Sequence, residues 1–231
     1  MLTVSDLNVQ SGATRAVRGL RLTVGTGAVI GLLGVNGSGK STVLQAIAGV
    51  IRPVRGSIQI NGEEISRYPL HRVVNRGVAF VPQDRGVVAP LTVTENLELS
   101  AMAGRGRLAS RREEVFALFP ELADLRTARA ESLNAGARLM LALGRAVMTR
   151  PIIILIDQPS RGLDDAAGDR LYAALAQIRD LGYGLLLTEQ NVARALSLCE
   201  YAYILRHGSL LAHGKPDALQ NTDEIAEAYL G

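Results

Sequence analysis

The sequence of 231 residues contains no tryptophan and a single cysteine, Cys199. Aromatic residues amount to 4% of the chain, too few for the stacked rings that bind single-stranded nucleic acid. One cysteine excludes an internal disulfide and is typical of a reducing compartment. No apolar run approaches the roughly 18 residues that cross a bilayer, and residues 1–20 lack the apolar stretch of a signal peptide. We therefore expect a soluble intracellular protein.

Lysine is also scarce, because Lys40 and Lys215 are the only lysines among 25 basic residues. The formal net charge is +3 and the sequence pI is about 9.3. The arginines are spread along the chain, and we expect their one local cluster to lie on a solvent-exposed helix face. That cluster consists of Arg105, Arg107, Arg111 and Arg112. A scattered excess of this size does not predict a nucleic-acid partner.

Short apolar segments separated by glycine predict several strands in the first third of the chain. Residues 20–24 alternate apolar and polar side chains, whereas residues 28–33 are apolar throughout and suit a strand buried on both faces. A helix is expected over residues 41–48, where apolar side chains recur at helical spacing. Another strand is expected at residues 57–60, leading into a hairpin turn at Asn61–Gly62.

The composition changes in the middle of the chain. From residue 94 to about residue 150, Ala, Leu, Glu and Arg dominate, with Pro120 as the main interruption, which predicts a helical lobe. Strands and helices then alternate. They are a buried strand at 152–156, a helix through 171–178, a strand at 184–187, a hairpin over 201–211 turning at His207–Gly208, and a helix at 223–230. This order predicts an α/β fold with a mostly parallel sheet and a small antiparallel part near the N-terminus.

A glycine-rich loop follows the apolar strand at residues 28–33. It matches the pattern G-x-x-x-x-G-K-[S/T] through Gly34, Val35, Asn36, Gly37, Ser38, Gly39, Lys40 and Ser41, with Thr42 next. The glycines let several backbone N–H groups point at one phosphate, and the N-terminus of the next helix adds partial positive charge. Lys40 can reach the outer phosphates of a nucleoside triphosphate, and the Ser41 hydroxyl can ligate Mg²⁺.

A second half of this site is expected on the strand at 152–156, because that strand ends in Asp157. An aspartate in this position can hold Mg²⁺ through water. Apolar strands that end in aspartate are common, so this prediction depends on the pairing of Asp157 with the phosphate loop.

Several further segments resemble one protein family. Residues 77–83 and 91–97 resemble its Q-loop and the start of its helical lobe, residues 186–191 its switch loop, and residues 227–231 its C-terminal segment. The chain thus resembles the ATP-binding subunits of ABC transporters, most closely the branch that serves branched-chain amino acid, urea or amide uptake. The resemblance covers nearly the full length and implies the ABC-type fold of P-loop NTPases.

The resemblance also implies a domain organisation and a set of site residues. We expect one nucleotide-binding domain over residues 1–231, with an ATP-binding core at 1–84 and 151–231 and a helical lobe at 85–150. Residues 34–42 would wrap the phosphates of ATP. Mg²⁺ would be surrounded by Ser41, Gln83 and Asp157.

The implied partners are a second ABC ATP-binding subunit, in a homo- or heterodimer, and transmembrane permease subunits. A solute-binding protein would act indirectly, and no nucleic acid is expected. The chain would lie peripherally at the cytoplasmic face of the cell (inner) membrane. Residues 160–164 resemble the loop that crosses to the partner subunit, and the signature segment would face the partner's ATP.

Three single positions and one segment depart from the family pattern. Gln158 stands where the catalytic glutamate is expected, and a carboxamide cannot take a proton from the attacking water, although it can orient that water. Gln190 stands at the switch position, where this branch often has glutamine. Ser11 aligns with the aromatic residue that stacks on adenine. The signature segment, normally Leu-Ser-Gly-Gly-Gln, is Leu133, Asn134, Ala135, Gly136 and Ala137.

These departures have functional consequences. Asn134 can still donate a hydrogen bond, but Ala135 replaces a glycine that could need a φ unavailable to alanine, so we expect weakened closure over the partner's nucleotide. Gln158 is either a natural divergence or an engineered trap that keeps binding and removes hydrolysis.

The sequence is compatible with three functions. The first is an ATPase subunit that drives import of amino acids or a similar small polar solute, with solute choice made by other subunits. The second is a catalytically degenerate nucleotide-binding partner or regulatory subunit with little ATPase activity. The third, an ABC ATPase of DNA repair or translation, is disfavoured because such proteins usually carry coiled-coil insertions or two cassettes.

Overall fold

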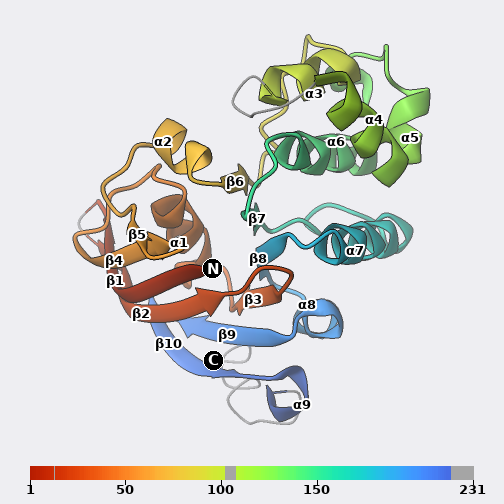
Figure 1. The fold of residues 1–231 in the computed structure, drawn as a ribbon. Helices are drawn as coiled ribbons and strands as arrows, with labels where there is room; N and C mark the ends of the chain where they lie inside the picture. Colours follow the sequence, from red (N-terminus) through yellow and green to blue (C-terminus); the bar gives the residue numbers. More distant parts are fainter. Residues whose placement is uncertain (13, 102–107, 220–231) are drawn as a thin grey trace.

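The computed structural model describes residues 1–12, 14–101 and 108–219. In these ranges the chain forms two β-sheets and a separate group of helices (Figure 1). The strands are β1 Leu2–Ser11, β2 Thr14–Val24, β3 Val29–Leu33, β4 Arg55–Ile60, β5 Glu63–Glu64, β6 Val78–Val81, β7 Ile153–Asp157, β8 Gly184–Glu189, β9 Tyr201–Arg206 and β10 Ser209–Gly214. The α-helices are α1 Lys40–Ile47, α2 Leu70–Asn75, α3 Val93–Ala101, α4 Leu108–Leu118, α5 Pro120–Asp124, α6 Ala135–Met148, α7 Asp165–Asp180, α8 Val192–Leu198 and α9 Pro216–Leu219.

The larger sheet has six strands in the order β10-β9-β3-β8-β7-β6. Strands β9 to β6 pair in parallel, and β10 pairs with β9 antiparallel. Alternate side chains of each central strand enter different cores, as the period of a strand requires. In β7, Ile154 and Ile156 pack with residues of α6, α7 and α8, whereas Ile153 and Leu155 pack with residues of α1, β1 and β2. The predicted mostly parallel sheet is confirmed.

The smaller sheet has four antiparallel strands in the order β2-β1-β4-β5. Helix α1 contacts β1 and β2 of this sheet and β7 of the larger one, so it packs between the two sheets. The predicted antiparallel part near the N-terminus is confirmed.

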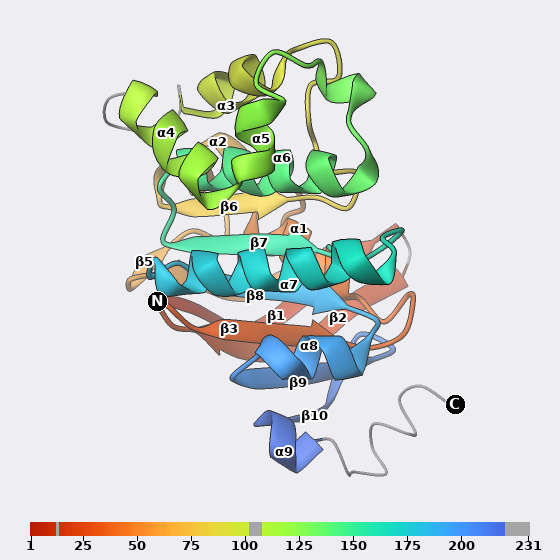
Figure 2. The same ribbon diagram turned by 90° about the vertical axis from the view of Figure 1, so that its right-hand side faces the viewer.

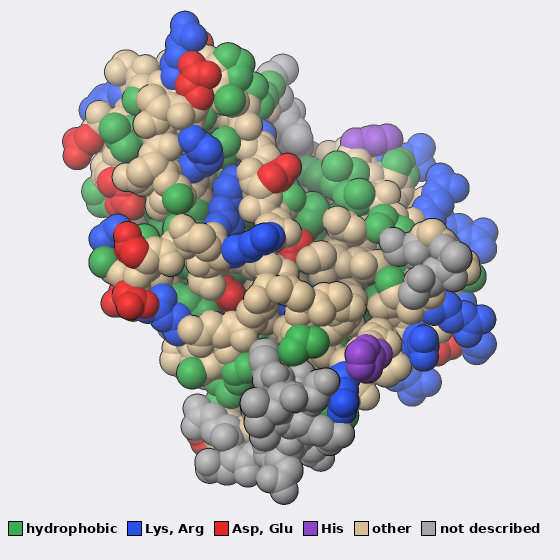
Figure 3. Space-filling model, turned by 180° about the vertical axis from the view of Figure 1, so that it is seen from behind, with side chains coloured by type: hydrophobic (Ala, Val, Ile, Leu, Met, Phe, Trp, Pro, Cys, Tyr) green, Lys and Arg blue, Asp and Glu red, His purple; other side chains and the backbone are tan. Residues whose placement is uncertain are grey.

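Basic side chains that are scattered in the sequence gather along the edge of the molecule formed by this sheet and α2 (Figure 3). Exposed arginines on β2, β4 and α2 include Arg15, Arg18, Arg21, Arg55 and Arg72.

Helices α3 to α6 form a group beyond β6, on the far side of the larger sheet from the smaller one (Figures 1 and 2). Pro120 is the first residue of α5, where the missing N–H of proline costs nothing. The expectation of a solvent-exposed arginine cluster is wrong for Arg111. This side chain is buried and its Nη1 donates to the carbonyl oxygen of Met148 at 3.0 Å, which joins α4 to the end of α6. Arg105 and Arg107 lie outside the described residues.

The C-terminal part of the larger sheet is the predicted hairpin, which turns at His207–Gly208 between β9 and β10. The helix predicted at 223–230 lies outside the described residues.

Cys199 follows α8 and is buried, and the desolvation of its thiol raises its pKa to about 12. Its sulfur lies beneath β3, where a Cβ on Gly31 would be only 3.0 Å away. Among the described residues, no helix is long and apolar enough to cross a membrane.

Candidate functional site

The predicted phosphate loop connects the buried strand β3 to helix α1. Gly34 and Gly39 have φ angles of 144° and 104°, which L side chains rarely adopt. A Cβ on Gly34 would also overlap the carbonyl oxygen of Leu205, and one on Gly39 would overlap that of Ala16. The loop is therefore wedged between the turn of the β9–β10 hairpin and β2, and glycine is required at both positions.

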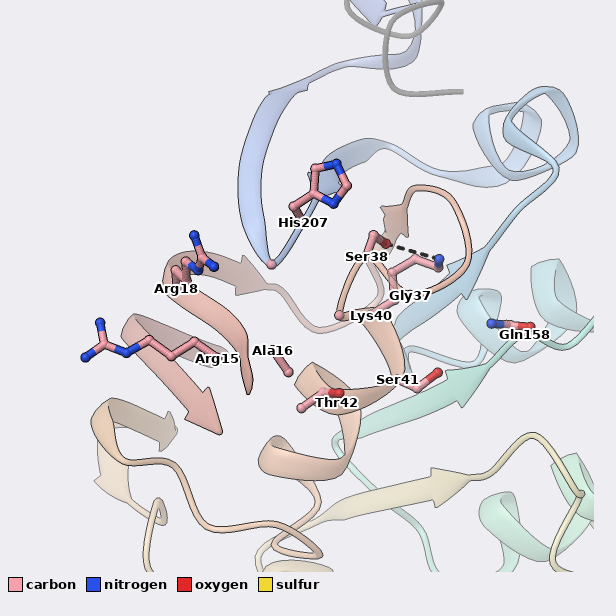
Figure 4. A pocket seen from close by; sticks show the side chains of 12 residues that line it. Arg15, Ala16, Arg18, Gly37, Ser38, Lys40, Ser41, Thr42, Gln158 and His207 are labelled. Atoms are coloured by element: carbon pink, nitrogen blue, oxygen red, sulfur yellow. Dashed lines mark hydrogen bonds between the residues drawn. The ribbon is translucent and has the colours of Figure 1, made fainter. Parts of the chain in front are cut away.

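Lys40 is the first residue of α1, and its ammonium group folds back over the loop (Figure 4). Nζ donates to the carbonyl oxygens of Gly34 at 2.6 Å and Val35 at 2.7 Å, and to Oγ of Ser38 at 3.3 Å. Burial of this group lowers its pKa, while the negative charges of Asp157 and Glu189 act in the opposite direction. A positive charge is thus fixed at the centre of the loop.

The structure brings Ser41 and Asp157 together although they are far apart in the sequence. The Ser41 hydroxyl donates to Oδ1 of Asp157 at 2.9 Å, and the Thr188 hydroxyl donates to the same oxygen at 2.7 Å. Asp157 and Thr188 are paired in the parallel register of β7 and β8. Thr188 also accepts a hydrogen bond from the backbone N–H of Gln158 at 2.9 Å, so it links the end of β7 to the next residue.

The chemistry of these groups fits a hard divalent cation. Ser41 and Asp157 present a hydroxyl and a carboxylate, which are the oxygen ligands that Mg²⁺ prefers. Both line a cavity of about 630 Å³, together with Gln83. The described residues contain no group of three or more His, Cys, Asp and Glu side chains that could hold a metal alone. A metal here would therefore depend on water or phosphate oxygens as well, which is usual for Mg²⁺.

Gln158 lies at the centre of a group of side-chain amides. Its φ of 46° places it in the left-handed region, and its side chain is buried. Oε1 of Gln158 accepts a hydrogen bond from Nε2 of Gln190 at 3.1 Å, and the same nitrogen donates to Oδ1 of Asn36 in the phosphate loop at 2.6 Å. A terminal atom of the Gln83 carboxamide lies 3.4 Å from Oε1 of Gln158. The structure thus brings together three of the predicted positions, and each carries an uncharged amide.

A second buried carboxylate belongs to Glu189, at the end of β8, and was not singled out from the sequence. Its two oxygens accept hydrogen bonds from the N–H of Ser160 at 3.0 Å and from the Ser160 hydroxyl at 2.8 Å. Desolvation raises the pKa of Glu189, and the hydrogen bonds from Ser160 partly offset this. An acidic residue at the end of the otherwise apolar strand β8 is the sequence signal that could have identified it.

Arg85 binds the same segment through its backbone carbonyl groups. Its Nη2 donates to the carbonyl oxygens of Pro159 at 2.9 Å and Arg161 at 3.2 Å. Burial lowers the pKa of Arg85, and the charge of Glu189 opposes this shift. Residues 159–161 are therefore fixed between a carboxylate from β8 and a guanidinium from the segment after β6.

The signature segment, Leu133 to Ala137, lies at the start of α6. Oδ1 of Asn134 accepts a hydrogen bond from the N–H of Ala137 at 2.8 Å, so Asn134 caps this helix. Ala135 and Gly136 open the helix, and neither is among the residues with positive φ. The expectation that Ala135 replaces a glycine with an unavailable φ is not met in this structure.

A second cavity beside the phosphate loop has a basic lining. A cavity of about 560 Å³ is lined by loop residues 37–42 together with Arg15, Ala16, Arg18, Gln158, His207 and Gly208. Figure 4 shows Gln158 at one side of the loop and Arg15, Arg18 and His207 on other sides. None of the described residues that line it is Phe or Tyr. Ser11 is the last residue of β1, and its predicted role beside adenine stays a prediction.

A family model and two similar proteins point to the same family. A family model described as ABC transporter matches residues 17–161. The high-affinity branched-chain amino acid transport ATP-binding protein BraG of Pseudomonas aeruginosa is 33% identical over 232 residues, covering 100% of both chains. The lipopolysaccharide export system ATP-binding protein LptB of Haemophilus influenzae is 33% identical over 235 residues, covering 100% of this chain and 97% of that protein.

Solved structures agree with the fold. An ATP-binding subunit of an ABC transporter superposes with a TM-score of 0.84 at 27% identity, covering 100% of this chain and 98% of that chain. An ABC transporter cassette in its ADP conformation superposes with a TM-score of 0.88 at 20% identity, with the same coverage. The predicted ABC-type α/β fold is confirmed. The chain belongs to the ABC transporter family, as an ATP-binding subunit of a transporter.

Proposed function

We propose that the chain binds Mg-ATP at residues 34–42 and serves a membrane importer of branched-chain amino acids or a similar small polar solute. The observation that carries the binding site is the meeting of Lys40, Ser41 and Asp157 around one loop. Lys40 supplies positive charge for the outer phosphates, and the backbone N–H groups at the start of α1 point in the same direction. The basic cavity lined by Arg15 and Arg18 supports a strongly anionic ligand.

Ser41 and Asp157 would hold Mg²⁺, with Gln83 nearby. When bound, the ion neutralises phosphate charge and fixes the geometry of the triphosphate. The hydrogen bonds of Asp157 to Ser41 and Thr188 hold the carboxylate in place before any ligand arrives, which reduces the ordering needed on binding.

Hydrolysis requires a water molecule to lose a proton, and Gln158 cannot accept it. Gln158 and Gln190 can orient a water through their amide groups, as glutamine does in some GTPases. General-base catalysis typically contributes about 10²- to 10⁴-fold to a rate. We therefore propose as a second function a nucleotide-binding partner with little ATPase activity of its own, which Gln158 specifically favours.

The proposed assembly is peripheral, at the cytoplasmic face of the cell membrane. It contains a second ABC ATP-binding subunit, identical or different, and transmembrane permease subunits, with a solute-binding protein acting indirectly. The relative BraG supports import of branched-chain amino acids. The relative LptB is equally similar and supports an export system as the rival. Gln190–Asn191, which resembles the switch loop of the uptake branch, favours import.

Two measurements test these proposals. Isothermal titration calorimetry of ATP with excess Mg²⁺ should show binding to the wild-type chain and loss of binding in Lys40→Ala. Lys215→Ala, which removes the other lysine, should bind ATP as the wild type does.

Cells that lack the chain should lose uptake of labelled leucine, isoleucine and valine, and the wild-type chain should restore it. Unchanged uptake in those cells would contradict the import proposal without affecting the binding proposal.

A further inference from the structure

An arginine occupies the metal side of the candidate site. With its oxygen oriented towards Arg161, the Gln83 carboxamide accepts hydrogen bonds from Nη1 and, at 3.2 Å, from Nε of this guanidinium. Both side chains line the cavity that contains Ser41 and Asp157. The group proposed to lie beside Mg²⁺ is therefore already bound to a cation of the same chain.

The backbone of Arg161 is held firmly, although its side chain is exposed. Arg85 donates to the carbonyl oxygen of Arg161 and to that of Pro159, two residues earlier. Glu189 accepts from both the N–H and the hydroxyl of Ser160 between them. Because the buried Glu189 and the half-buried Arg85 fix residues 159–161, the guanidinium of Arg161 starts from a defined position next to Gln83.

A guanidinium and Mg²⁺ cannot share the Gln83 oxygen at low cost. The carboxamide has one oxygen, and two cations bound to it would repel each other across a few ångströms. The carboxylates of Asp84 and Asp157 also line this cavity and attract either cation. Removal of the guanidinium would free the oxygen and leave these negative charges for the metal.

We propose that Arg161 competes with Mg²⁺ for Gln83 and thereby sets the Mg²⁺ concentration that nucleotide binding requires. This inference rests on the proposed Mg-ATP site. Arg161 acts here through Gln83 as a positioning residue, and its effect is on metal dependence and not on the affinity for the nucleotide itself.

The test measures ATP binding by calorimetry over a series of free Mg²⁺ concentrations. Arg161→Leu should lower the half-saturating Mg²⁺ about two- to fivefold, the range expected when one exposed interaction of a charged side chain is lost, with ATP affinity at saturating Mg²⁺ unchanged. Arg170→Leu is the matched control, because Arg170 is an exposed arginine of α7 outside both cavities. In a Gln83→Ala background, Arg161→Leu should have no further effect, because the shared oxygen is gone.

Three results would overturn the inference: an unchanged half-saturating Mg²⁺, an effect that persists without Gln83, or a loss of ATP but not ADP affinity at saturating Mg²⁺. The last result would mean that the guanidinium pairs with the outer phosphate. A folded wild-type chain that fails to bind ATP at every Mg²⁺ concentration would overturn the proposed function as well. Normal ATP binding with unaltered metal dependence would overturn the role of Arg161 alone. Thermal melting of each variant checks that it is folded.

Discussion

Nε2 of Gln190 lies 3.1 Å from Oε1 of Gln158, so an amide from the end of β8 holds the amide that follows β7. The same Gln190 nitrogen reaches Asn36 in the phosphate loop. A carboxylate at residue 158 would accept the hydrogen bond from Gln190 equally well. The surroundings of residue 158 therefore have room for a glutamate. The glutamine that is present differs from a catalytic glutamate because its amide cannot take up a proton.

Gln158→Glu is expected to raise Mg-ATP turnover by about 10²- to 10⁴-fold, because it supplies the missing proton acceptor. Phosphate release, measured with the chain assembled with its membrane partners, checks this. Adding Lys40→Ala to the same variant should abolish the gain.

Equal rates for the two forms would show that residue 158 is not the proton acceptor. Turnover in neither form, with ATP binding intact in both, would mean that other departures, such as the signature segment, have inactivated the site.

Glu189 makes stability depend on pH in a defined direction. Burial raises the pKa of Glu189 above its ordinary value of 4.5, so the folded chain binds the proton more tightly than the unfolded chain does. Stability from this group is thus complete below pH 4.5 and is lost as the pH rises through the higher pKa of the folded state. Urea midpoints should fall more for the wild type than for Glu189→Gln over that interval. Parallel curves for the two proteins would contradict the assignment.

Asn134 is expected to stabilise the start of α6 through its cap. Asn134→Ala removes the acceptor for the Ala137 N–H and should lower the free energy of unfolding by about 1 kcal/mol. Asn134→Asp keeps a side-chain oxygen there and should retain most of the stability. Urea denaturation of the three proteins distinguishes the outcomes, and an Asn134→Asp variant as unstable as Asn134→Ala would refute the cap.

Gly39 and Gly37 offer a matched pair within the phosphate loop. Both have positive φ, but a Cβ on Gly39 would overlap the Ala16 carbonyl oxygen, whereas one on Gly37 meets no atom within 4 Å. Gly39→Ala should therefore abolish ATP binding. Gly37→Ala should cost about 1–2 kcal/mol of backbone strain and keep measurable binding. Calorimetric titration checks both, and equal losses would show that steric overlap at Gly39 does not matter.

Much of the fold could be predicted because the central strands carry strong local signals. Strands β3, β7 and β8 are short apolar runs that end at glycine or at a polar residue, and each was expected close to its observed position. The short helix α2 and strand β6 were not expected as elements, since their patterns are brief and their apolar faces become evident only against neighbouring strands. Local pattern also could not show that Arg111 would be buried, because its partner, the Met148 carbonyl, lies 37 residues away.

The same limit applies to the site. The phosphate loop and Asp157 follow from motif and context, since each residue type there has a chemical reason. Ser160 and Glu189 are 29 residues apart, and no local sequence pattern around either residue predicts their contact. Asn134 shows the same limit. Its cap on the Ala137 N–H is a local feature, whereas the role implied by the family resemblance, contact with a partner's nucleotide, depends on a second subunit.

The burial of Cys199 beneath β3 gives the protein an internal reporter. Thiolate is the form that reacts with alkylating agents, and a pKa of about 12 leaves almost none at neutral pH in the closed molecule. Modification must therefore wait for α8 and β3 to separate. Strand β3 leads directly into the phosphate loop. The rate at which iodoacetamide alkylates this single thiol therefore measures how often the strand that supports nucleotide binding opens.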